Sequence, residues 1–188
     1  MQVARAAVWH IGLFVLMIAS AIVVDLALHW SGRLAWGRYL GYVGSLSILL
    51  AFLYSLRKRK VITVGRPARF LAGHEILSWL GAMLVLAHGG IHANALLPWL
   101  AMAAMLTAVA SGLTGKYLLQ RSREIVRRRQ TDLRAQGLSA QELEERLYWD
   151  AAAVSLMKQW RVVHLPITAA FVILALLHVV TILLFWRW

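Results

Sequence analysis

The sequence predicts an all-α integral membrane protein: a helical bundle of about five transmembrane helices, with its N-terminus cytoplasmic and its C-terminus external. Of its 188 residues, 61% are hydrophobic and the mean hydropathy is +0.66, whereas an ordinary soluble domain is about half apolar. The apolar residues also fall in runs of about 20, the length at which a helix crosses a bilayer. The basic residues collect on one side of these runs, as they do in cytoplasmic loops.

Five segments have the length and hydropathy of a membrane span, at about 7–30, 37–56, 70–92, 96–119 and 161–186. The first is too long for a cleaved signal peptide, and no small-residue cleavage site clearly follows its apolar core. It is therefore predicted to be a retained span. We expect a single domain over residues 1–188, with one polar insertion at about 120–160.

The basic residues predict the orientation of the spans. Arg5, the loop between the second and third spans and the loop between the fourth and fifth spans together carry 17 of the 20 Lys and Arg residues. This side should be cytoplasmic. The formal net charge of +12 is explained by this topology and by contact with anionic lipid headgroups, so we expect no nucleic-acid partner.

The insertion at 120–160 is predicted to be a cytoplasmic helical hairpin. The first helix should continue the fourth span and break at Gly137, and Ser139 and Glu142 have the spacing of a capping box that begins the second helix. Leu143 and Leu147 would give this second helix an apolar face. We expect the hairpin to lie on the membrane surface, with docking of a soluble partner as the alternative.

Four of the seven histidines form two pairs with the same spacing. His74 and His88 are 14 residues apart in the third span, and His164 and His178 are 14 apart in the fifth. Fourteen residues bring a helix back to within about 40° of the same face, about 21 Å further along. Because both spans cross in the same direction, His74 should face His164 on the cytoplasmic side and His88 should face His178 on the external side.

Two imidazoles on opposite faces of one planar ring are the ligands of a low-spin b-type haem. The chain has no cysteine, which excludes disulfides, thiolate-bound iron–sulfur clusters and covalent c-type haem. Zinc would require three or four ligands at one point, whereas these ligands fall into two separate pairs. The sequence thus predicts two b-type haems, one in each leaflet, that form an electron path across the bilayer.

The stretches GHEILSWLGAMLVLAH and WRVVHLPITAAFVILALLH carry these histidines. They resemble the di-haem core of membrane cytochromes b, including ferric-reductase-like transmembrane domains and the cytochrome b of quinol–cytochrome c oxidoreductases. The resemblance covers about 37–186 and implies that His74, His88, His164 and His178 are axial haem ligands. It also implies an electron-transfer subunit of an oxidoreductase complex in a prokaryotic-type inner membrane. No flavin- or nicotinamide-binding domain follows the fifth span, so we expect other chains or diffusible molecules to supply and accept the electrons.

Several other residues are candidates for supporting roles. His92 lies 18 residues after His74 on the same helical face, and is either an alternative outer ligand or part of an external quinone site. Asp25 and His29 share one face of the first span. They are interpreted either as part of a quinone site or as an interfacial hydrogen-bonded pair. Six basic residues are candidates for binding haem propionates: Arg66, Arg69, Lys158 and Arg161 on the inner side, and Arg33 and Arg38 on the outer side. The alternative is that the positive-inside rule and snorkelling alone explain their positions.

The function favoured by the sequence is electron transfer between a quinone pool or a cytoplasmic flavo- or iron–sulfur protein and an external partner such as a cytochrome c. A histidine-lined transporter is the first alternative, but it predicts polar residues in several spans, and the second and fourth spans carry few. An accessory membrane scaffold without haem is the second alternative, and it explains neither the equal spacing nor the matched depths of the histidines.

Overall fold

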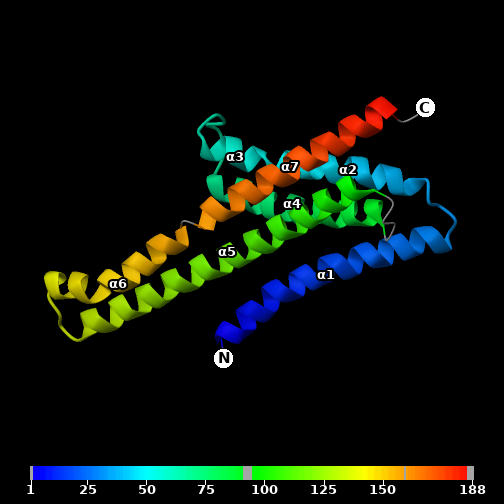
Figure 1. The fold of residues 1–188 in the computed structure, drawn as a ribbon. Helices are drawn as coiled ribbons and strands as arrows, with labels where there is room; N and C mark the ends of the chain where they lie inside the picture. The colour runs from blue at the N-terminus through cyan, green and yellow to red at the C-terminus, as the bar shows by residue number, and fades with distance from the viewer. Residues whose placement is uncertain (1, 91–94, 159, 186–188) are drawn as a thin grey trace.

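The computed structural model describes residues 2–90, 95–158 and 160–185, and every regular element in these ranges is a helix. The helices are α1 (Gln2–Trp30), α2 (Trp36–Ala51), α3 (Leu53–Lys58), α4 (Pro67–Gly89), α5 (Leu96–Ala135), α6 (Ala140–Lys158) and α7 (Trp160–Phe185). Figure 1 shows α1, α4 and α7 running in one direction, and α2 and α5 in the other.

Five helical segments are long and apolar enough to cross a membrane, which confirms the predicted number: Val8–Trp30, Trp36–Lys58, Pro67–Gly89, Leu96–Ala135 and Val162–Phe185. Most of their large apolar side chains are exposed, as expected of helices that face lipid. The second span differs from the prediction because it is interrupted at Phe52. There the backbone N–H bonds to the Leu49 carbonyl three residues earlier, a tighter turn that separates α2 from α3.

The spans pack as two helix pairs, which are joined by α1 and by direct contact between α4 and α5. Helix α2 packs on α4 and α5 packs on α7, while α1 touches both α4 and α5. In the described part of the chain, the backbones of α4 and α7 stay more than 8 Å apart along their whole length. The two helices that carry the paired histidines are therefore parallel but are not packed directly against each other.

The hairpin formed by α5 and α6 confirms the predicted break and cap. Gly137 adopts a φ of +77° in the turn, and Ser139 and Glu142 make both capping-box contacts, Ser139 N–H to Glu142 Oε2 at 2.9 Å and Glu142 N–H to Ser139 Oγ at 3.4 Å. Leu133 of α5 is buried against Leu143 and Leu147 of α6.

The direction of the hairpin differs from the prediction. Helix α5 continues without interruption to Ala135, and the hairpin projects from the bundle along the direction of the spans instead of turning across it (Figure 1). The sequence contains no glycine or proline between Gly115 and Gly137. Nothing therefore breaks the helix where it leaves the apolar part of the bundle.

Candidate functional site

The structure brings the four spaced histidines together in two pairs. His74 of α4 lies within electrostatic interaction range of His164 of α7, and His88 of α4 lies within such range of His178 of α7. The pairing is the one expected from the spacing and direction of the two helices. The ligand role of these residues stays a prediction.

The His74 ring is held by α2. Its Nδ1 lies 3.1 Å from the Ala51 carbonyl oxygen, and its ring centroid lies 5.5 Å from that of Tyr54. A carbonyl only accepts hydrogen bonds, so Nδ1 carries a proton, and in the neutral tautomer this leaves the lone pair on Nε2. Histidines that bind a metal through one nitrogen commonly donate from the other in this way.

The His88 ring is held in the same manner at the other end of the bundle. Its Nδ1 donates to the Gly37 carbonyl of α2 at 2.9 Å. Gly41, one turn further along α2, makes room for the ring: a Cβ at that position would lie 2.8–2.9 Å from His88 Cγ, Cδ2 and Nδ1. The absence of a side chain at Gly41 therefore allows the ring to lie directly on the α2 backbone.

His164 is positioned by α5. Ser111 Oγ donates to the Ala108 carbonyl at 2.9 Å and lies 2.6 Å from His164 Nδ1. The other ring nitrogen also has a hydroxyl beside it: Thr168 Oγ1, which donates to the His164 carbonyl at 2.8 Å, lies 3.4 Å from Nε2. Gly112 lies beside the ring, with 3.6 Å between a Cβ built there and His164 Cε1.

His178 differs from the other three. In the part of the chain that the structure describes, its ring has the electrostatic interaction with His88 but no hydrogen-bond partner. Among the described residues, three of the four rings thus form hydrogen bonds with the supporting helices α2 and α5, and the His178 ring does not.

A small apolar cluster separates the two histidine pairs. It consists of Met17, Ala82, Met105 and Phe171, from α1, α4, α5 and α7 respectively. Phe171 lies seven residues from both His164 and His178, about two turns from each. Gly81, midway between His74 and His88, packs against Gly44 and Ile48 of α2.

An ion pair links α4 and α5 next to the inner histidines. Lys116 Nζ lies 2.6 Å from Oε2 of Glu75, the residue that follows His74. Sequence reasoning did not select Lys116, because the two residues are 41 positions apart and no local pattern connects them. Arg66 and Arg69 are exposed near this end, Arg33 and Arg38 are exposed near the other, and the side chains of Lys158 and Arg161 are not described.

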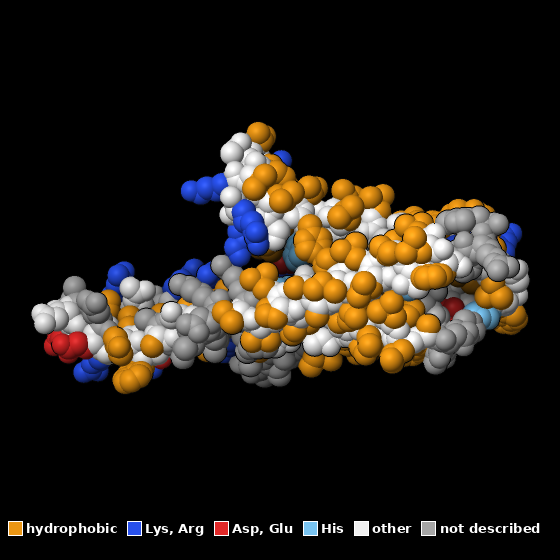
Figure 2. All heavy atoms as spheres, turned by 45° about the horizontal axis from the view of Figure 1, so that its top comes forward, with side chains coloured by type: hydrophobic (Ala, Val, Ile, Leu, Met, Phe, Trp, Pro, Cys, Tyr) orange, Lys and Arg blue, Asp and Glu red, His pale blue; other side chains and the backbone are white. Residues whose placement is uncertain are grey.

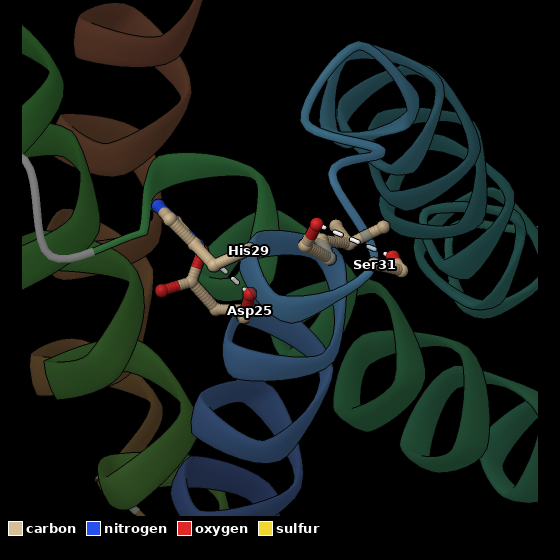
Figure 3. A network of polar contacts seen from close by, with 4 residues as sticks. Asp25, His29 and Ser31 are labelled. Atoms are coloured by element: carbon tan, nitrogen blue, oxygen red, sulfur yellow. Dashed lines mark hydrogen bonds and ion pairs between the residues drawn. The ribbon is translucent and has the colours of Figure 1, made fainter.

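Asp25 and His29 form the contact expected from their spacing. His29 Nδ1 lies 2.9 Å from the Asp25 carbonyl oxygen and 3.5 Å from Asp25 Oδ1, and Asp25 is buried. Figure 3 shows these two side chains together at the end of α1, with Ser31 turned to the other side. The Asp25 carboxylate lies against Gly90, with 3.0 Å between Oδ1 and a Cβ built at that glycine. A quinone role for the pair stays a prediction, and His92 lies outside the described residues.

The residues present fit a group that needs two axial imidazoles. Within residues 2–90, 95–158 and 160–185, no three His, Cys, Asp or Glu side chains converge as ligands of one metal ion. The histidines come in facing pairs, from helices whose Cα atoms stay more than 8 Å apart, and His74 and His88 each donate from Nδ1 to a backbone carbonyl. Comparisons with protein families, with curated proteins and with solved structures find no match for this chain.

Proposed function

We propose that this protein is a di-haem membrane cytochrome b that carries electrons across the bilayer as a subunit of an oxidoreductase complex. The observation that carries the proposal is the pairing of His74 with His164 and of His88 with His178, across two helices that are not packed against each other. Direct helix packing would bring the helix axes to about 8–10 Å and leave no room for a planar cofactor. Here α4 and α7 each pack on a different neighbour instead.

Two b-type haems would supply reversible one-electron chemistry at two points along the membrane normal. The protein orients the imidazoles: α2 accepts hydrogen bonds from His74 and His88, and Ser111 of α5 is hydrogen-bonded to His164. Such hydrogen bonds increase the electron density on a ligand and so tune a metal site. The apolar cluster around Phe171 excludes water from the region between the pairs.

The proposed location is a prokaryotic-type inner membrane, with the N-terminus and the α5–α6 hairpin cytoplasmic and the C-terminus external. The distribution of basic residues supports this orientation. Electrons would pass between a quinone pool or a cytoplasmic flavo- or iron–sulfur protein and an external partner such as a cytochrome c. The buried Asp25 beside His29 is the candidate proton-accepting group of an external quinone site.

A reduced-minus-oxidised visible spectrum with haem quantitation tests the proposal. Purified protein, expressed with adequate haem supply, should contain two b-type haems per chain. His164→Ala should remove only the inner haem and His178→Ala only the outer one. Purified protein that is folded but contains no haem would overturn the proposal in favour of a transporter or a scaffold. Loss of the outer haem in His92→Ala but not in His88→Ala would reassign the outer ligand.

A further inference from the structure

Basic residues line two sides of the end of the molecule that holds the inner histidine pair. The first side is the segment 53–69, here called the α3 lobe, which contains six Lys and Arg residues and no acidic residue. Arg57 closes its loop by donating from Nε and Nη2 to the Gly65 carbonyl, at 3.1 and 3.0 Å. The other five basic residues of the lobe are exposed: Lys58, Arg59, Lys60, Arg66 and Arg69.

The second side is a stripe of basic residues along one face of α5, consisting of Lys116, Arg123, Arg127 and Arg134. Their offsets of 7, 11 and 18 residues place Arg123, Arg127 and Arg134 within about 20° of Lys116 around the helix axis. All four are exposed. Helix α6 does not cover them, because its contact residue Leu133 lies about 100° away around α5.

The other arginines in this part of α5 each have an acidic partner. Arg121 and Arg128 pair with Glu124, and Arg129 pairs with Asp150 of α6. Among the described residues, the three arginines of the stripe make no such ion pair. Arg121, Arg128 and Arg129 share two carboxylates, whereas the three stripe arginines have none, so most of the uncompensated charge of these six arginines lies on the stripe.

The stripe leads from the tip of the hairpin to the inner histidine pair. Its first residue, Lys116, is the partner of Glu75 next to His74. Figure 2 shows a hollow between the α3 lobe and the hairpin, with basic side chains at its border and histidine and acidic atoms visible inside it. A molecule that entered this hollow would meet positive charge on two sides and the inner site at its base.

We propose that this hollow is the docking site of an acidic, cytoplasmic, one-electron carrier protein that exchanges electrons with the inner site. The proposal rests on the proposed function and adds to it a surface and the charge of the partner. Positive potential on two walls would steer a negatively charged protein into the hollow and raise its association rate. The Lys116–Glu75 pair marks the point of closest approach to His74.

Anionic lipid does not account for the stripe. From Lys116 to Arg134 it extends about 27 Å along a helix that projects in the direction of the spans. The headgroup layer on one side of a bilayer is about 5–8 Å thick, and the attraction of its surface charge decays over about 8–10 Å. Measured along the helix from Lys116, Arg127 lies at about 16 Å, near the limit of this reach, and Arg134 lies at about 27 Å, beyond it.

The test uses the full chain in phosphatidylcholine nanodiscs, with an acidic flavodoxin and an acidic plant-type ferredoxin as probes. The test variant neutralises the three arginines of the stripe: Arg123→Gln, Arg127→Gln and Arg134→Gln. The matched control removes the same charge from the same helix outside the stripe: Arg121→Gln, Arg128→Gln and Arg129→Gln. Binding is measured by biolayer interferometry at low and high salt, and helicity by circular dichroism shows whether each variant folds.

We expect at least one probe to bind in a salt-sensitive manner, and the test variant to bind it about tenfold more weakly. The control should stay within about twofold of the wild type. Equal loss in both variants, or no binding of either probe, would overturn the docking site. Hydrogen exchange of residues 120–135 distinguishes a protein partner from anionic lipid. Protection of this segment by anionic nanodiscs but not by the probes would also overturn the docking site.

The binding assay needs no haem, so its outcome is distinct from that of the proposed function. Stripe-dependent binding by protein that contains no haem would leave the docking site standing and overturn the electron-transfer role. Two haems per chain without stripe-dependent binding would overturn the docking site and leave the electron-transfer role standing. With both present, stopped-flow reduction of the haem by the bound probe should slow in the test variant and not in the control.

Discussion

Gly41→Ala should selectively weaken the outer site. The added Cβ would lie 2.8–2.9 Å from three atoms of the His88 ring, whereas carbon atoms in contact sit at about 3.5–4.0 Å. The ring must therefore move by about 0.7 Å or more. A shift of this size strains or breaks the 2.9 Å hydrogen bond from Nδ1 to the Gly37 carbonyl.

Overpacking of this kind costs about 1–3 kcal/mol, and the hydrogen bond contributes about 1 kcal/mol. Together they oppose the native ring position by about 2–4 kcal/mol, which corresponds to about 30- to 700-fold weaker binding of a cofactor through His88. Haem quantitation and redox titration should show loss or a shifted potential of the outer haem, with the inner haem retained. Gly73→Ala is the control, because a Cβ there meets nothing within 4 Å. Two haems with unchanged potentials in Gly41→Ala, or loss of the inner haem instead, would refute the reasoning.

Three further predictions concern the inner site and the hairpin. Ser111→Ala removes the hydrogen-bond partner of His164 Nδ1, so inner-haem affinity should fall about 10- to 100-fold, as measured by haem transfer to apomyoglobin, and Ser111→Thr should restore it. The backbone N–H and then the hydroxyl of Ser139 lower the pKa of Glu142. The contribution of Glu142 to stability is therefore present above the unfolded pKa of about 4.3 and is lost as the pH falls through the folded pKa. Hydrogen exchange of α6 should accelerate in that pH range in the wild type. The Glu142→Gln variant should lack this acceleration. Leu147→Ala should destabilise the hairpin by about 2 kcal/mol, and unchanged exchange rates in α5 and α6 would contradict the packing of the cluster.

The supporting contacts of the candidate site were not predictable from local sequence patterns. Gly41 and Ser111 lie in the second and fourth spans, 47 and 53 positions from the histidines that they contact. In the sequence they resemble the small residues of any membrane helix. Only the placement of α2 against α4 and of α5 against α7 gives them a role, and the same holds for Phe171 between the two pairs.

The sequence by itself determined the properties that depend on the chain's local periodicity. Apolar runs of span length predict five membrane helices, the 14-residue intervals predict which face of each helix carries its histidines, and Gly137 with Ser139 predicts where the hairpin turns and restarts. These features follow from the helix repeat, from hydrophobicity and from backbone freedom, which act within one segment.

The tertiary structure alone decided which helices pack together and what each histidine touches. It separated α4 from α7, rested the His74 and His88 rings on α2, and paired Lys116 with Glu75. It also set the direction of the α5–α6 hairpin, and so placed the basic stripe beside the α3 lobe. These outcomes depend on through-space packing between residues tens of positions apart, for which a single sequence contains no repeating signal.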